Sequence, residues 1–184
     1  MKGIVFTVLN ELVENQFGMD VWDSLLNRTG HDGAYTTAAS YPDAEAMSLV
    51  AGLSAHTGLP VNDLVRVFGR YLFGAFERQY PVFFQLPQTA KEFLKSVDEI
   101  IHVEVRKLYP DAVLPVFEYE DPAENRLVML YRSTRQLCPL AEGLLEGAAA
   151  HFQTSIQYEQ TKCTHRGDDH CRFELLLGGE HDNN

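Results

Sequence analysis

The sequence predicts an α+β fold, with N-terminal helices and a twisted antiparallel sheet in the second part of the chain. Up to about residue 110, apolar residues recur every three or four positions, the spacing of a buried helical face. Further on they alternate in short runs, which is typical of strands. No repeat or long linker divides the chain, so we predict a single domain over residues 1–184, with a helical part at about 1–110 and a sheet-containing part at about 111–178.

Glycine and proline signals divide the helical part into separate helices. Gly18, Gly30 and Gly58 stand where helical spacing stops, and glycine is common just beyond a helix C-terminus. The last helix carries an apolar stripe at Leu94, Val97, Ile101, Val105 and Leu108, and Pro110 follows it. The predicted helices cover residues 1–17, 20–26, 41–57, 59–80 and 89–109.

The sheet-containing part alternates strand and helix signals. Strands are predicted at 113–119 and 126–133, joined by a turn at 120–125. An Ala-, Leu- and Gly-rich stretch at 137–152 predicts a helix. Two further strands, at 154–164 and 170–177, form a predicted hairpin, and residues 178–184 form a polar tail.

Composition excludes several partners. The chain has 15 Lys and Arg against 26 Asp and Glu, a formal charge of −11, which disfavours nucleic acid and anionic membrane surfaces. No run approaches the roughly 18 apolar residues of a membrane span. The N-terminus does not have the pattern of a signal peptide, and three cysteines, an odd number, do not suggest a disulfide framework. We therefore expect a cytoplasmic protein.

The candidate site begins with His102, in the last predicted helix, and a later Y-x-S-x-R run formed by Tyr131, Ser133 and Arg135. A neutral imidazole can bind iron, and residues two apart on a strand face the same way. Two hydroxyls and a guanidinium would suit a pair of carboxylates, which together suggests haem. On spacing alone, a solvated helical histidine and a half-exposed edge strand are the better interpretation.

The chain also resembles the haem nitric oxide/oxygen binding (H-NOX) family, which is related to the haem domain of soluble guanylate cyclase. The likeness runs through nearly the whole chain and suggests a stand-alone bacterial NO-sensing member. It is carried by Met1-Lys2-Gly3-Ile4, Gly18-Met19-Asp20-Val21-Trp22, Ile101-His102-Val103-Glu104-Val105, Leu114-Pro115, Tyr131-Arg132-Ser133-Thr134-Arg135, Glu142-Gly143-Leu144-Leu145-Glu146-Gly147-Ala148 and Gly167-Asp168-Asp169-His170.

The resemblance implies a haem b held between the helices and the sheet. His102 would be the proximal iron ligand, and Tyr131, Ser133 and Arg135 would hold the propionates. Pro115 stands where the family presses a proline against the macrocycle and distorts it. Val5 and Leu144 stand where relatives line the pocket.

The same resemblance addresses which gas binds. O2-binding relatives place a tyrosine where this chain has Leu140 and a supporting tryptophan where it has Leu9. Because bound O2 depends on a nearby hydrogen-bond donor more than NO does, we expect a sensor of NO and CO that excludes O2.

The expected output is release of His102, signalled in trans to a histidine kinase or a cyclic-di-GMP enzyme, with no catalysis by this chain. Two alternatives remain open. One is a non-haem binder of hydrophobic ligands. The other is a haem peroxidase-like enzyme, which would need a polar distal residue.

Three cysteines, Cys138, Cys163 and Cys171, fall outside the haem argument. With one histidine they could form a structural zinc site, although three partly buried free thiols are the simpler interpretation. Some bacterial relatives bind zinc here with a histidine three residues before the second cysteine. This chain has Gln160 at that position, so the fourth ligand stays open, with His165 as the nearest substitute.

Overall fold

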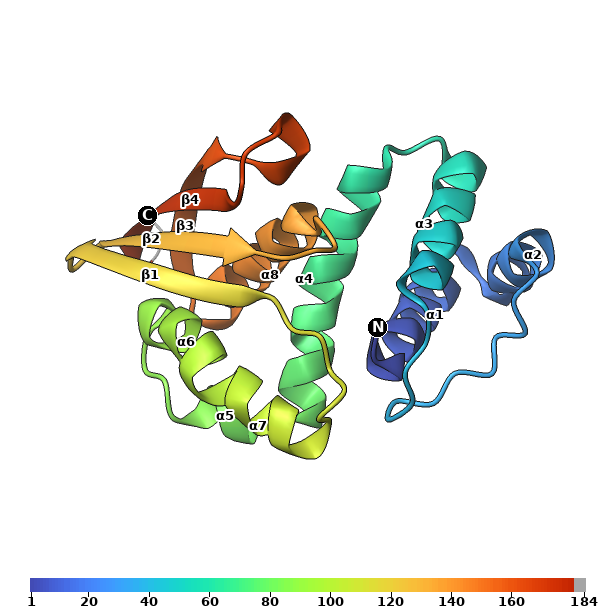
Figure 1. The fold of residues 1–184 in the computed structure, drawn as a ribbon, viewed down its shortest axis with the longest axis horizontal. Helices are drawn as coiled ribbons and strands as arrows, with labels where there is room; N and C mark the ends of the chain where they lie inside the picture. The colour runs from blue at the N-terminus through green and yellow to red at the C-terminus, as the bar shows by residue number, and fades with distance from the viewer. Residues whose placement is uncertain (181–184) are drawn as a thin grey trace.

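The computed structural model describes residues 1–180. It confirms a mixed fold in which helices come first and an antiparallel sheet follows (Figure 1). The elements are α1 (Gly3–Phe17), α2 (Met19–Thr29), α3 (Asp43–Thr57), α4 (Val61–Gln79), α5 (Val82–Gln85), α6 (Ala90–Ser96), the π-helical turn η1 (Val97–Ile101), α7 (His102–Leu108), β1 (Val116–Ala123), β2 (Arg126–Arg132), α8 (Cys138–His151), β3 (Thr154–Lys162), the 3₁₀ turn η2 (Thr164–Arg166) and β4 (Cys171–Glu180). Within these residues no helix is long and apolar enough to cross a bilayer.

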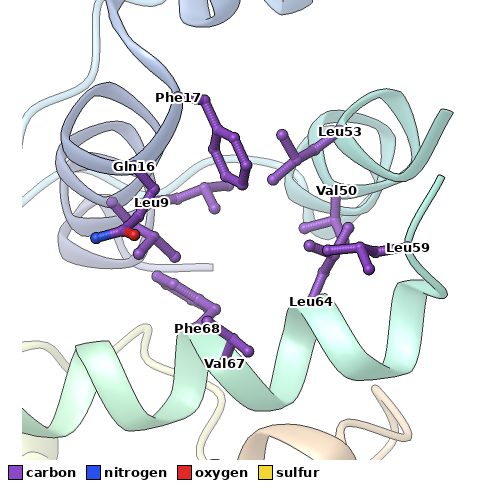
Figure 2. A pocket seen from close by; sticks show the side chains of 10 residues that line it. Leu9, Gln16, Phe17, Val50, Leu53, Leu59, Leu64, Val67 and Phe68 are labelled. Atoms are coloured by element: carbon purple, nitrogen blue, oxygen red, sulfur yellow. The ribbon is translucent and has the colours of Figure 1, made fainter. Parts of the chain in front are cut away.

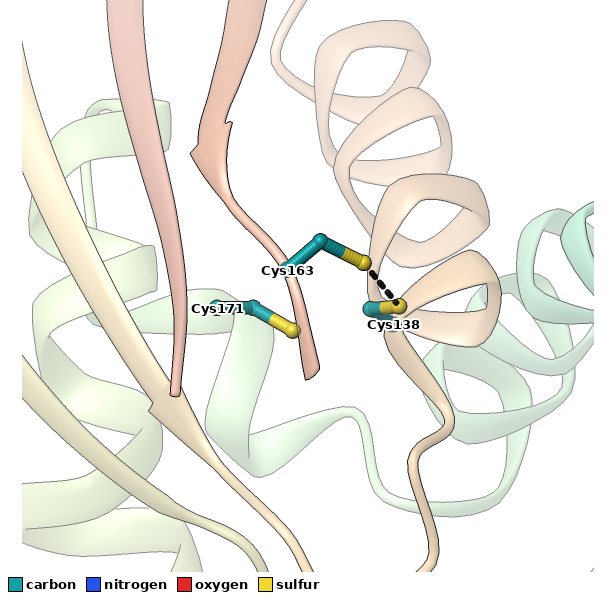
Figure 3. Close-up of side chains that lie close together, drawn as sticks. All are labelled: Cys138, Cys163 and Cys171. Atoms are coloured by element: carbon teal, nitrogen blue, oxygen red, sulfur yellow. Dashed lines mark hydrogen bonds between the residues drawn. The ribbon is translucent and has the colours of Figure 1, made fainter. Parts of the chain in front are cut away.

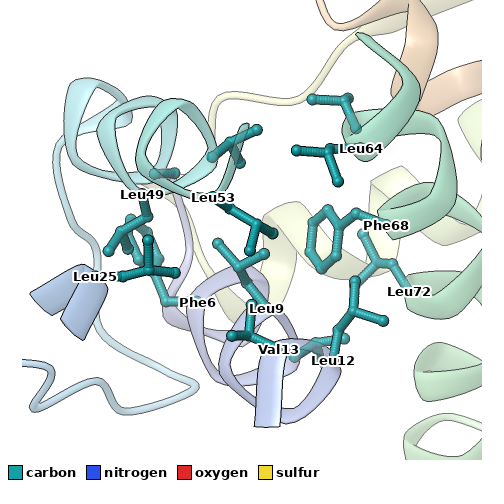
Figure 4. Packing of buried hydrophobic residues seen from close by; sticks show 14 of the residues in the cluster. Phe6, Leu9, Leu12, Val13, Leu25, Leu49, Leu53, Leu64, Phe68 and Leu72 are labelled. Carbon is teal, nitrogen blue, oxygen red and sulfur yellow. The ribbon is translucent and has the colours of Figure 1, made fainter. Parts of the chain in front are cut away.

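One hydrophobic core joins α1, α2 and α3 to one face of α4 (Figure 4). Val8, Leu9, Leu12 and Val13 of α1 are all buried, as their helical spacing predicts. A second core lies between the sheet, α6, α8 and Phe73 on another face of α4. The long helix α4 therefore contributes to both cores and stands between them in Figure 1.

Helices α4 and α8 cross in close contact because glycines face each other at the crossing. A Cβ atom on Gly143 of α8 would overlap the backbone carbonyl oxygen of Arg66 in α4. A Cβ atom on Gly69 of α4 would meet the carbonyl oxygen of Leu140 in the same way. This contact fixes α8, and the residues just before it, against the helical part.

The sheet has the strand order β1-β2-β4-β3, with every neighbouring pair antiparallel. Phe117 pairs with Tyr131, and Tyr131 pairs in turn with Cys171 on β4. The predicted face of Leu127, Met129 and Tyr131 is buried in the second core. The sheet thus brings the candidate tyrosine close to the cysteines.

Two strands end later than predicted. Strand β1 continues to Ala123, because a bulge between Glu120 and Ala123 lets the strand pass the acidic residues and Pro122 before the turn at 124–125. Strand β4 continues to Glu180, so residues 178–180 belong to the sheet and not to a polar tail. The rest of that predicted tail, 181–184, lies outside the described residues.

The predicted helix at 89–109 is not one regular α-helix. The π turn η1 separates α6 from α7 and inserts extra residues into the helical repeat. The predicted apolar stripe holds in part as far as Ile101, because Val97 and Ile101 pack against the second core, but Leu108 is 67% exposed. His102, one position beyond the stripe, is the residue of α7 that is buried.

Candidate functional site

His102 is placed at the junction of η1 and α7, and only 9% of it is exposed. Its Nδ1 lies 3.2 Å from Oδ1 of Asp98 in η1. Burial lowers the pKa of His102, although the hydrogen bond to Asp98 opposes that shift. Nε2 has no hydrogen-bond partner among residues 1–180. The imidazole is therefore neutral near pH 7 and has one ring nitrogen available.

Phe117 connects His102 to the predicted tyrosine. The ring centroid of Phe117 lies 5.7 Å from that of His102 and 5.3 Å from that of Tyr131. Tyr131 is buried, and burial raises its pKa to about 12, while a hydrogen bond with Ser133 acts in the opposite direction. Sequence spacing alone gave no reason to single out Phe117, because alternating aromatic residues on a strand usually indicate only core packing.

Ser133 and Arg135 lie just beyond the end of β2, in the turn that leads to α8. The strand ends at Arg132, one residue earlier than predicted, so strand alternation does not set their directions. Ser133 Oγ accepts a hydrogen bond from the Arg135 backbone N–H at 3.2 Å. Both residues therefore lie in the connection between strand β2 and helix α8.

The guanidinium of Arg135 contacts two distant segments. Nε donates to Oδ2 of Asp43, the first residue of α3, at 2.6 Å. Nη1 donates to the carbonyl oxygen of Val113, in the connection between α7 and β1. Nη2 makes no hydrogen bond within the described residues, so one donor of the fork remains available. Asp43 is a site neighbour that sequence reasoning missed, and its separation in the chain from Arg135 left no signal.

The predicted pocket residues are divided between the two cores. Leu9 is buried in the first core, and Val5 and Leu140 pack against it. Leu144 packs against the second core. Pro115 is half-buried in the connection before β1. All five side chains are apolar, so none of them can donate a hydrogen bond to a ligand.

A small cavity of about 100 Å³ lies beside Leu9, between α1, α3 and α4 (Figure 2). Its lining is apolar apart from Gln16. A shallower pocket lies between α4, α5 and the end of α8, next to His151. His102 lines neither space. The first cavity is lined by Leu9, Leu12, Gln16, Phe17, Val50, Leu53, Leu59, Leu64, Val67 and Phe68.

The three cysteines converge behind the sheet (Figure 3). Their sulfur atoms all lie within 4.8 Å of one another, and all three thiols are buried. The Sγ atoms of Cys138 and Cys163 are 3.8 Å apart. Burial raises the pKa of the Cys138 thiol to about 12, although the neighbouring Gln160 side chain opposes this. The cluster joins the start of α8 to the loop between β3 and β4.

The structure distinguishes the two positions considered for the fourth ligand of a tetrahedral metal site, His165 and Gln160. His165 is exposed, and its Nε2 lies 2.7 Å from the carbonyl oxygen of Gln136, so the structure does not bring it to the thiols. Gln160 does lie beside Cys138, and its Nε2 is buried without a hydrogen-bond partner. A buried amide without a partner is costly. Gln160 is therefore the neighbour whose side chain would gain most from rearranging when an ion binds.

The side chains around His102 fit a haem. One neutral imidazole presents a free nitrogen, Phe117 lies next to both this ring and Tyr131, and Ser133 and the available guanidinium nitrogen of Arg135 follow Tyr131 in the chain. Iron takes imidazole nitrogen, and propionates take hydroxyl and guanidinium donors. The fold and these residues define a haem-binding sensor domain as the class of protein.

Comparison with known proteins identifies the family. A model described as haem-NO-binding matches residues 2–160, and the chain therefore belongs to the haem-NO-binding, or H-NOX, family. An H-NOX protein from S. oneidensis, solved in the Fe(II)NO ligation state, is 36% identical with a TM-score of 0.93, and the match covers 97% of this chain and 100% of that chain. The H-NOX from Shewanella woodyi, bound to IWP-051 in the Fe(II)CO ligation state, is 35% identical with a TM-score of 0.86, over 100% of this chain and 98% of that chain.

The family relationship extends to animal cyclases. Soluble guanylate cyclase 89Da of Drosophila melanogaster is 27% identical over 139 residues, which is 73% of this chain. The chain spans about a fifth of the length of that relative, since the match covers 20% of it. The similarity therefore relates this chain to one part of the cyclase.

Proposed function

We propose that this chain is a haem b-based sensor that binds NO and CO and excludes O2. The single observation that carries the proposal is His102, a buried neutral imidazole whose Nε2 has no partner within residues 1–180. When bound, ferrous haem would supply an iron that takes a diatomic gas. His102 supplies the proximal bond.

Three side chains hold the propionates in this proposal. Tyr131 and Ser133 offer hydroxyl donors, and Arg135 offers its available Nη2. Asp43 supports the clamp because it orients the guanidinium from the other side. Pro115, half-buried just before β1, would press against the macrocycle and distort it.

Selectivity follows from the apolar character of Val5, Leu9, Leu140 and Leu144. O2 is held firmly only where a donor hydrogen-bonds to it, and these side chains have none. Related H-NOX proteins have been solved with NO and with CO, which supports binding of these two gases. A peroxidase-like reaction would need a polar distal group that these four positions do not offer.

Signalling depends on release of His102 after NO binds. His102 begins the short helix α7 after the π turn and is the buried residue of that helix, so loss of the bond would free a segment with few other buried side chains. We propose that a histidine kinase or a cyclic-di-GMP enzyme in the cytoplasm reads this change in trans, and that this chain performs no catalysis.

A structural zinc ion is a second proposal. Three buried thiols lie within 4.8 Å of one another, and zinc prefers such cysteine ligands as thiolates. The positive charge of a bound zinc ion would stabilise the thiolates despite their burial. Gln160 beside Cys138 and Thr164, whose Oγ1 lies 3.5 Å from Cys171 Sγ, are neighbours that carry a side-chain oxygen, while His165 would have to leave Gln136.

An absorption titration of the purified ferrous protein with NO, CO and O2 tests the sensor proposal. We expect a Soret band in the isolated protein, clear shifts with NO and with CO, and none with O2. Absence of a Soret band after haem is supplied would favour a non-haem binder of hydrophobic molecules. A persistent spectral species under O2 would contradict the proposed selectivity.

A further inference from the structure

Asp98 is the polar contact of the His102 ring. Its Oδ1 lies 3.2 Å from His102 Nδ1 and also accepts the backbone N–H of Phe117 at 3.4 Å. One carboxylate oxygen therefore connects the π turn, the imidazole and the first residues of β1. The carboxylate is itself partly buried, with 25% of its side chain exposed.

The π turn explains why this contact forms at the site and not on the surface. In a continuous α-helix the apolar stripe would centre on Ile101 and leave His102 at its flank. The inserted turn moves the buried face by about one residue, so His102 faces the interior and Asp98 lies beside it. Its neighbour Glu99, in the same turn, is exposed.

A carboxylate on the second nitrogen of a metal-binding imidazole has two effects. It fixes the tautomer, so that the other nitrogen carries the lone pair, and it makes that nitrogen a stronger donor. The Phe117 N–H donates to the same oxygen, and this second hydrogen bond reduces both effects in part. Arg106 on α7 is the other charged group that acts on the ring, and it opposes positive charge there.

We propose that Asp98 is a positioning residue that sets the strength of the bond between His102 and haem iron. This inference rests on the proposed function. The carboxylate holds Nδ1–H, directs Nε2 to the iron and strengthens the bond that NO must break. Asp98 thereby sets how readily His102 is released. The hydrogen bond from the Phe117 N–H connects Asp98 to strand β1.

Resonance Raman spectroscopy of the ferrous holoprotein tests the inference through the iron–histidine stretching band. Asp98→Asn keeps the shape but removes the charge, so we expect the band to move to lower frequency and release of His102 by NO to become about tenfold faster. Glu99→Gln is the matched control, because it removes a neighbouring carboxylate that is exposed. It should leave the band and the release rate unchanged.

The outcomes separate this inference from the proposed function. If the iron–histidine band of Asp98→Asn has the same frequency as that of the wild type, the inference is overturned but the proposed function is not. A wild-type haem protein without any iron–histidine band overturns the proposed role of His102 and the inference with it.

If Asp98→Asn does not retain haem, ¹⁵N shifts of the His102 ring in the apo protein answer the question. The wild type should hold the Nδ1–H tautomer and the variant a mixture, and identical tautomers would overturn the inference.

Discussion

Nε of Arg135 lies 2.6 Å from Oδ2 of Asp43, and this ion pair joins the turn after β2 to the start of α3. The N-terminal ammonium of Met1 lies 2.6 Å from the other carboxylate oxygen. Burial raises the pKa of Asp43, but the hydrogen bonds from Arg135 and the ammonium outweigh it and bring the pKa below its ordinary value of 3.8. The carboxylate thus connects the two parts of the fold at the proposed propionate clamp.

Asp43→Asn should lower the free energy of unfolding near neutral pH by less than about 1 kcal/mol, because a pair this exposed is screened by solvent. A group whose pKa is depressed on folding stabilises the protein above its ordinary pKa and loses that effect as pH falls through the folded value. The gap between wild type and variant should therefore close below pH 3.8. Urea unfolding across this range measures it, and Asp63→Asn, an exposed carboxylate on α4, is the control. A gap that persists in acid would contradict the assignment.

Leu140→Tyr should give the proposed pocket a hydrogen-bond donor. Leu140 packs against the first core, as does Val5 of α1, and Leu9 of the same helix belongs to that core. A phenol hydroxyl there would stabilise O2 at the iron, so aerobic exposure should produce a lasting shift of the Soret band. Leu140→Phe adds the same ring without the donor and should behave like the wild type. Equal responses of the two variants to O2 would argue against Leu140 as a distal residue.

Gly143→Ala should destabilise the protein by about 2 kcal/mol, because the new Cβ would overlap the carbonyl oxygen of Arg66 and push α8 from α4. Gly74→Ala is the matched control on α4, since the nearest atom to its new Cβ, other than its neighbours, is Arg78 Nη1 at 3.5 Å. That change should be neutral or stabilise by up to about 1 kcal/mol. Chemical denaturation of both variants would decide, and equal stabilities would contradict the close crossing.

Local patterns in the sequence predict most of this fold, and long-range contacts account for what they miss. The spacing of Val8, Leu9 and Leu12 predicts a buried face of α1, and the structure has it. The stripe centred on Ile101 fails at Leu108 because the π turn changes the helical repeat, and apolar periodicity carries no signal of an inserted turn.

The candidate site shows the same division. His102 and Tyr131 belong to recognisable motifs and are brought near each other through Phe117. Asp98 stands four residues before His102, so helical spacing could have suggested that pair. The contact of Asp43 with Arg135 depends on how α3 meets the sheet, which no local pattern encodes.

Gln160→His should complete a set of three thiols and one imidazole. Gln160 lies beside Cys138 with its Nε2 buried and unpaired. We expect the variant to keep zinc at chelator concentrations about tenfold or more above those that strip the wild type. Zinc measured beside iron during chelator titration gives the answer. Cys163→Ser should lose zinc both in the wild type and in Gln160→His. If none of these changes alters the zinc content, a site at the cysteines is contradicted.

His102→Gly tests the central claim most directly, through the absorption spectrum of the ferrous protein with and without added imidazole. If His102 supplies the proximal bond, the variant should lose its haem or bind it with an altered Soret band, and free imidazole should restore the wild-type spectrum and its response to NO. A variant that keeps the wild-type spectrum and NO response without imidazole would contradict the account.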